Sequence, residues 1–143
     1  MKKAGYDCTR EYYINDAGAQ ITNLGKSLYA RYRELFGLDF VLPEDGYHGP
    51  DIIETAKQIK DKDGDKYLSM DEDEVVEIFK KLGRDSKLET IKKDLAYYGC
   101  EFDSWISENW IVEQGRVEDA VKKMQDKNLL YEKDGAIWFE ATK

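Results

Sequence analysis

The sequence predicts an α/β protein: a strand and helix open the chain, a mostly helical stretch follows, and a β-hairpin ends it. A run rich in Tyr, Thr and Ile at 6–14 leads directly into a helical pattern. Several segments between 50 and 98 carry apolar residues at helical spacing. Near the C-terminus Asp134-Gly135 separates two apolar runs, which is a strong hairpin signal.

The stretch at 5–20 contains the most informative turn of the chain. Asn15 and Asp16 should end the strand 6–14 and offer side-chain oxygens to the free N–H groups of the next helix. In open α/β sheets, ligands bind just beyond the carboxyl ends of strands. The polar turn formed by Asn15, Asp16, Gly18 and Gln20 is therefore a candidate functional site, and an ordinary helix N-cap is the alternative.

The first half of the chain should hold two long helices. The residues Met1–Ala4 resemble the last turn of a helix that ends at Gly5, which suggests a chain cut from something longer. A helix is expected from about 17 to 36, closed by Gly37, and another begins at Pro50, where a missing N–H is harmless.

The second half should alternate helices and strands. One amphipathic helix carries Val75 to Leu82 and is expected to close at Gly83. Another should start near Asp85 and end at Gly99. The strand predicted at 100–107 can pair in parallel with the first strand through this long crossover, and a helix at 116–127 precedes the hairpin.

The loop at 38–50 contains His48, the single histidine of the chain. Because it has no second His, Ser or Cys nearby, a His-based catalytic triad or metal site is excluded. Its position between two glycines and next to Tyr47 leaves two possibilities, a substrate lid and a plain solvated loop.

The residues 61–72 resemble a calcium-binding EF-hand loop between two helices. Its ligand positions would be filled by four carboxylates, Asp61, Asp63, Asp65 and Glu72. However, Lys66 occupies the sixth position, where the loop needs glycine for a sharp turn, and no second loop of this kind exists. A charged helix–helix turn is the alternative that we favour.

Composition and charge restrict the classes of partner. The net charge is −8, and it is uneven: residues 1–36 hold six Lys/Arg against four Asp/Glu, while the remainder holds 16 against 26. An acidic body does not by itself attract a phosphate backbone. Two cysteines, Cys8 and Cys100, favour buried free thiols over a disulfide framework. No apolar run or leader indicates a membrane span or secretion, so a cytoplasmic protein without a membrane partner is expected.

Several blocks of the sequence together resemble arginyl-tRNA synthetases. The first is Gly-Tyr-Asp-Cys-Thr-Arg-Glu-Tyr-Tyr-Ile-Asn-Asp-Ala-Gly-Ala-Gln at 5–20, and further blocks lie at 23–32, 42–49, 52–54, 64–68, 102–108 and 130–138. The resemblance covers nearly the whole chain. It implies a class I synthetase that uses ATP and Mg to activate arginine and then esterifies it to the 3′ end of tRNA(Arg), on a Rossmann-type sheet.

The chain lacks the two signatures of the class, His-Ile-Gly-His and the Lys-Met-Ser-Lys-type loop. No catalytic residue can therefore be assigned to it. The resemblance implies that Asn15, Asp16, Gly18 and Gln20 shape the floor of the ATP and arginine site or support the signature helix. A second hypothesis is that Tyr47, His48 and Gly49 form a mobile loop near the substrate or the tRNA end.

The domain organisation expected from this resemblance is one part of a catalytic domain over 1–143. Residues 1–37 supply a strand and helix of a partial Rossmann-type core, 38–99 a mainly helical insertion, and 100–143 a strand, helix and hairpin. We expect the segment alone to be inactive and to bind no cofactor. Core surface left uncovered should favour self-association.

Overall fold

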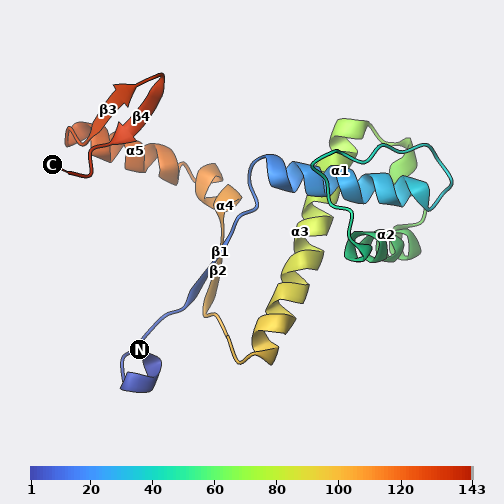
Figure 1. The fold of residues 1–143 in the computed structure, drawn as a ribbon, viewed down its shortest axis with the longest axis horizontal. Helices are drawn as coiled ribbons and strands as arrows, with labels where there is room; N and C mark the ends of the chain where they lie inside the picture. The colour runs from blue at the N-terminus through green and yellow to red at the C-terminus, as the bar shows by residue number, and fades with distance from the viewer. Residues whose placement is uncertain (143) are drawn as a thin grey trace.

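The computed structural model describes residues 1–142, which form a mixed α/β structure that is mostly helical (Figure 1). Three parts follow one another in space: a unit of three helices, a two-stranded sheet, and a C-terminal unit of two helices and a hairpin. The elements are η1 (Lys2–Ala4), β1 (Glu11–Ile14), α1 (Ala19–Glu34), α2 (Pro50–Asp63), η2 (Lys66–Ser69), α3 (Glu72–Tyr97), β2 (Ser104–Ser107), α4 (Glu108–Glu113), α5 (Arg116–Asp126), β3 (Leu130–Lys133) and β4 (Ala136–Phe139).

The hydrophobic core lies in the unit formed by α1, α2 and α3. Its fully buried side chains include Leu28, Tyr32, Ile52, Val75 and Phe79. The rings of Tyr32 and Phe79 meet edge to face, with centroids 5.3 Å apart, as aromatic pairs prefer. The buried Tyr32 hydroxyl donates a 2.5 Å hydrogen bond to the Gly64 carbonyl, so the one polar atom of this ring is satisfied.

The helix predicted to close at Gly83 continues without a break to Tyr97, so the expected pair of helices is one helix, α3. Gly83 is buried, and a Cβ atom there would lie 3.1 Å from Leu24 Cγ of α1. On α1, a Cβ on Gly25 would lie 3.0 Å from the Lys80 backbone nitrogen of α3. Both glycines therefore serve the close crossing of α1 and α3, and Gly83 does not end a helix as predicted.

The two predicted strands do pair in parallel, with Glu11 opposite Ser104 and Ile14 opposite Ser107. Each is shorter than expected, four residues instead of nine and eight. Tyr12 and Trp105 face each other in this register and their rings stack at 4.5 Å. A Rossmann sheet needs further strands, and among residues 1–142 this sheet contains two.

The C-terminal unit contains the predicted hairpin, in which Leu130 pairs with Phe139. Asp134 and Gly135 both have positive φ angles, 54° and 73°, which is the conformation of a type I′ turn. The helix α4 was not predicted, because it is only six residues long and begins directly where β2 ends. No helix among residues 1–142 is long and apolar enough to span a membrane.

The two cysteines are free, as expected, but they are not buried. Cys8 is half-buried and Cys100 is exposed. The expectation of burial failed because the strands begin later than predicted, and both cysteines lie in the irregular chain before them.

Candidate functional site

The carboxyl end of β1 holds a buried carboxylate, that of Asp16, whose side chain is 1% exposed. The Ser107 hydroxyl donates to it at 2.8 Å and the Asn109 backbone N–H at 3.0 Å. The Arg84 Nη1 donates from α3 at 3.2 Å. One side chain thus connects β1, α3 and the junction of β2 with α4, which lie far apart in the sequence.

The bonds to Asp16 decide its charge. Burial by itself would raise the pKa of the carboxyl, but the Asn109 N–H, the Ser107 hydroxyl and the Arg84 guanidinium outweigh it and hold the pKa below the ordinary value. Burial by itself would lower the pKa of Arg84, but its hydrogen bonds to Asp85 and Asp16 and their charges raise that pKa above the ordinary value. The pair is therefore ionised at neutral pH and holds its elements together by charge-assisted hydrogen bonds.

The expectation that Asn15 and Asp16 cap the following helix is wrong. The N-cap of α1 is Gly18, with no side-chain capping bond, and its φ of 83° and ψ of −163° suit glycine alone. Asp16 instead serves α4, where its carboxylate accepts from Asn109 while the Ser107 hydroxyl accepts from the Trp110 N–H at 3.0 Å. The two side chains divide between them the free N–H groups at the start of α4.

Asp16 and its three partners, Arg84, Ser107 and Asn109, are called the Asp16 node below. A cavity of about 360 Å³ lies between β1, α1 and α3 and shares Arg84 with this node. Asn15, Gln20 and Tyr47, three of the predicted site residues, line it together. Within residues 1–142 the side chains of these three make no hydrogen bond. Three free polar groups around an apolar cavity match the usual composition of a ligand site.

The loop before α2 is fastened to α1 at one point. The Tyr47 backbone N–H donates to the Ser27 hydroxyl at 2.9 Å, and that hydroxyl donates to the Asn23 carbonyl at 2.7 Å. Tyr47 is thereby held at the cavity. His48 is exposed and does not line the cavity, so the structure brings together Asn15, Gln20 and Tyr47 but not His48.

Sequence reasoning missed three residues of the node: Arg84, Ser107 and Asn109. Arg84 lies in the middle of α3, where the sequence pattern predicts that a charged residue belongs to the solvent-exposed face of the helix. The sequence Ser107-Glu108-Asn109 had a usable signal, since a serine followed by an acidic residue is typical of a helix start. The pairing of both with Asp16 is tertiary and has no local signature.

The alternative calcium site is not assembled. Asp61 and Asp63 lie in the last turn of α2, and the carboxylate of Asp63 accepts a 2.8 Å hydrogen bond from the Tyr67 hydroxyl. Burial and this bond raise the pKa of Tyr67 to about 12. Over the described part of the chain, no three His, Cys, Asp or Glu side chains cluster as metal ligands would, Asp65 and Glu72 included.

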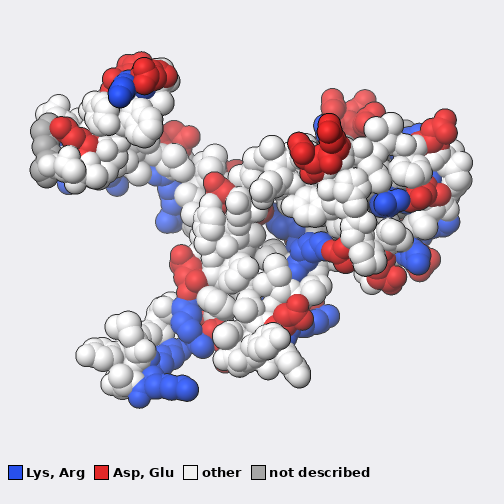
Figure 2. Space-filling model, in the orientation of Figure 1, with Lys and Arg blue, Asp and Glu red and all other residues white. Residues whose placement is uncertain are grey.

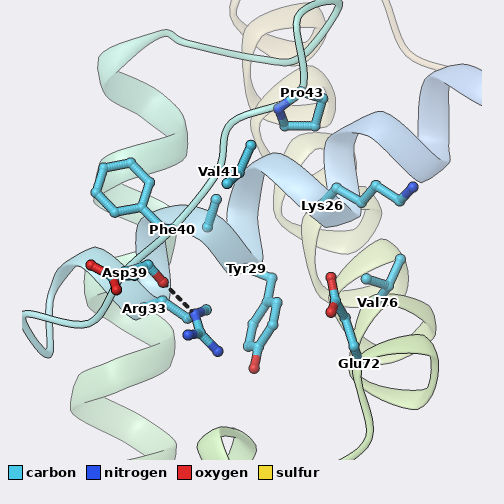
Figure 3. Close-up of a pocket in the computed structure, with 10 residues that line it drawn as sticks. Lys26, Tyr29, Arg33, Asp39, Phe40, Val41, Pro43, Glu72 and Val76 are labelled. Atoms are coloured by element: carbon cyan, nitrogen blue, oxygen red, sulfur yellow. Dashed lines mark hydrogen bonds between the residues drawn. The ribbon is translucent and has the colours of Figure 1, made fainter.

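A second cavity, of about 480 Å³, lies between α1, the loop at 39–43 and the start of α3 (Figure 3). Arg33 and Lys26 reach it from α1, and Glu72 faces it from α3. The Arg33 Nε donates to the Asp39 carbonyl at 2.8 Å. The charges around it are mixed and none of the strand-end residues line it, so the site at Asp16 and the 360 Å³ cavity remains the stronger candidate.

Comparison with known proteins identifies the relatives of this chain. It is 52% identical over 142 residues to the arginine–tRNA ligase of Shouchella clausii, a match that covers 99% of this chain and 26% of that protein. The chain matches a segment of the arginine–tRNA ligases. The ligases of Geobacillus kaustophilus and Carboxydothermus hydrogenoformans match at 47% and 48% identity, over 99% and 100% of this chain and 26% of each.

The fold agrees with this match. A crystal structure from Campylobacter jejuni described as an arginyl-tRNA synthetase superposes with a TM-score of 0.80 at 29% identity, over 96% of this chain and 30% of that one. No protein-family model matches the chain. The resemblance to class I arginyl-tRNA synthetases is confirmed, and the chain spans about a quarter of the length of the curated relatives. These relatives give no support to a calcium-binding module.

Proposed function

We propose that this chain is part of the catalytic domain of a ligase that activates arginine with ATP and transfers it to tRNA(Arg). The observation that carries the proposal is the alignment of 99% of the chain with arginine–tRNA ligases. The sequence identity ranges from 43% to 52% among the relatives compared. Alone, the chain is inactive, because it lacks both class signatures. As a part, it supplies a positioned strand end and the helical unit beside it.

The two-stranded sheet is, in this proposal, part of a larger Rossmann-type sheet. Parallel strands are normally buried on both faces and continue into neighbouring strands. Here Tyr13 of β1 is 55% exposed, and both strands have a free edge among the described residues. Completion of the sheet by further strands would cover these edges and place Asp16 at the carboxyl edge, where α/β sheets bind ligands.

The role of the strand-end residues is positional. Asp16 shapes the floor of the arginine and ATP site by fixing the junction of β2 with α4, while Gly18 lets the chain turn and Gln20 faces the cavity. Tyr47 and His48 belong to the adjoining loop. Among residues 1–142 no group of three or more His, Cys, Asp or Glu side chains could hold a metal ion. ATP and Mg are needed by the full-length ligase in this proposal.

A chimera tests the proposal. This chain replaces the matching 142-residue segment of the Shouchella clausii ligase, and arginine-dependent ATP–pyrophosphate exchange and tRNA charging are measured. We expect the chimera to be active, and Asp16→Ala to lower its activity by about 10- to 100-fold, because small displacements of positioned groups cost that much. Asp61→Ala, on the exposed end of α2, is the matched control.

The proposal fails if the chimera folds, as judged by its circular dichroism and melting, and yet charges no tRNA. The positional role alone fails if Asp16→Ala and Gln20→Ala leave arginine activation unchanged. Unaltered charging by His48→Ala would separately remove the loop histidine from the site.

A further inference from the structure

The 480 Å³ cavity between α1, the loop at 39–43 and the start of α3 is lined by polar groups that have no partner. Among residues 1–142, the Glu72 carboxylate, the Lys26 ammonium group and the Tyr29 hydroxyl make no hydrogen bond or ion pair. Tyr29 is only 7% exposed, and the hydroxyl of a buried tyrosine usually has a hydrogen-bond partner. The cavity therefore contains a donor that a bound molecule can use.

Arg33 is held in a fixed orientation at this cavity. Its Nε donates to the Asp39 carbonyl at 2.8 Å, and its guanidinium carbon lies 5.8 Å from the centre of the Tyr29 ring (Figure 3). The two terminal nitrogens of Arg33 have no partner within the part of the chain that the structure describes. A guanidinium group held in this way offers two parallel N–H donors, which match the two oxygens of a carboxylate.

An acidic group lies across the cavity from this arginine. In Figure 3 the Tyr29 ring stands between the Arg33 guanidinium and the Glu72 carboxylate. The carboxylate of Glu72 attracts an ammonium group and repels a second negative charge. Figure 2 shows acidic and basic side chains on the same face of the unit formed by α1, α2 and α3, so its surface charge there is mixed. Arg33 and Glu72 together therefore favour a ligand with one negative and one positive charge over a phosphate.

The rest of the wall is apolar. It is formed by side chains of the loop and of α3, namely Phe40, Val41, Pro43 and Val76. Phe40 and Val41 are 37% and 87% exposed, so a ligand that packs on them removes apolar surface from water. The volume of 480 Å³ falls within the range of about 300–1,000 Å³ that is typical of small-molecule sites. This wall suits an apolar side chain carried between the two charges of the ligand.

We propose that this cavity binds a small apolar zwitterion, either a free amino acid or a short peptide with free ends. Its carboxylate lies on Arg33 and its ammonium group on Glu72. The apolar side chain packs on Phe40 and Val41, and the Tyr29 hydroxyl donates to the carboxylate. This site shares no residue with the 360 Å³ cavity, so the inference goes beyond the proposed function and does not depend on it.

Calorimetric titration of the chain with leucine and two blocked derivatives tests the charge contacts. N-acetyl-leucine lacks the ammonium group, and leucinamide lacks the carboxylate. Each should bind about tenfold more weakly than leucine, because each loses charge-assisted hydrogen bonds. These ligands need no variant of the protein, so this test holds whether or not a substitution disturbs folding.

Two substitutions assign each charge of the ligand to one residue. Arg33→Gln should weaken leucine binding by about tenfold and abolish the preference for leucine over leucinamide, but keep the preference over N-acetyl-leucine. Glu72→Gln should do the converse. Arg116→Gln and Glu74→Gln are the matched controls, since Arg116 stacks on Trp110 and Glu74 lies in the first turn of α3, both outside the cavity. Circular dichroism confirms that each variant is folded.

The hydroxyl contact and the source of the ligand need one more variant and one more ligand. Tyr29→Phe should weaken leucine binding by about three- to fivefold, because the ring is kept and one hydrogen bond is lost. Tighter binding of leucine than of leucyl-leucine indicates a free amino acid, and the reverse indicates a short peptide.

Three results would overturn the inference. The first is a dissociation constant for leucine weaker than about 10 mM. The second is equal affinity for leucine, N-acetyl-leucine and leucinamide, which would mean that neither charge is recognised. The third is competition by inorganic phosphate, or by arginine, at lower concentrations than leucine itself requires, which would show that the site prefers another charge.

Discussion

Asp16 shows how far a single residue can be understood from the sequence. Its position after a strand marked it as a candidate site residue, because strand ends are where α/β proteins place polar groups. Its predicted local capping role was wrong, since its partners Ser107 and Asn109 lie more than 90 residues away. Nothing in the neighbourhood of Asp16 distinguishes a carboxylate that caps its own helix from one that caps a distant helix.

The ionised state of Asp16 should make the stability of the chain depend on pH. Its folded-state pKa is lowered, so its stabilisation is complete above the unfolded-state pKa of about 3.9 and disappears as the pH falls through the folded-state value. Asp16→Asn should lower the free energy of unfolding by about 1–3 kcal/mol at pH 7, the range for hydrogen bonds to charged groups. Urea denaturation at pH 7, 5 and 3 measures this.

The direction of the pH effect is read from the unfolding free energies of the wild-type chain and of Asp16→Asn. The difference between their unfolding free energies should shrink as the pH falls below about 4, because the wild-type carboxylate then gains a proton. Asp61→Asn, exposed at the end of α2, should cost little at any pH. A difference that stays constant from pH 7 to 3 would mean that the charge of Asp16 contributes nothing to folding.

Among the elements, those whose signals are local were predicted well. The hairpin follows from Asp134-Gly135, whose positive φ angles the turn demands, and α2 begins at Pro50 as expected. The predicted break in α3 was wrong, because the role of Gly83 depends on a tertiary contact. Glycine near the end of an apolar pattern usually stops a helix, but Gly83 is required by the approach of Leu24 from α1, a contact that sequence periodicity does not reveal.

Alanine substitutions at the two crossing glycines should differ in cost. At Gly83 the added Cβ meets the movable side chain of Leu24 at 3.1 Å, and better helix propensity offsets part of the overpacking. At Gly25 it meets the Lys80 backbone nitrogen and the Val76 carbonyl oxygen at 3.0 Å, which cannot move without displacing α3. We expect losses of about 1 kcal/mol at Gly83 and about 2–3 kcal/mol at Gly25.

Urea unfolding of Gly83→Ala, Gly25→Ala and the exposed control Lys93→Ala provides the measurement. Lys93 lies on α3 with a side chain that is 79% exposed, so its replacement should change the unfolding free energy by less than about 0.5 kcal/mol. If Gly83→Ala proved stabilising, Leu24 would have room to move and the crossing would be looser than the structure shows.

The arrangement of the whole molecule concentrates its buried residues in one part. The core is confined to α1, α2, α3 and η2, whereas no residue of α4, α5, β3 or β4 is fully buried. Along β4, Ile137, Trp138 and Phe139 are at least 50% exposed. An apolar strand of this kind beside a free sheet edge is a surface that other chains can cover.

The isolated chain should therefore associate with itself through its C-terminal unit. Sedimentation velocity over a range of concentrations should reveal species larger than the monomer, and the double substitution Ile137→Lys and Phe139→Lys should weaken their formation by about tenfold or more, because it places charge on the apolar edge. Val41→Lys is the matched control, since Val41 is 87% exposed but lies on the loop between α1 and α2. Association that resists the double substitution, or that Val41→Lys abolishes equally well, would place the contact elsewhere, with the open edges of β1 and β2 as the next surface to test.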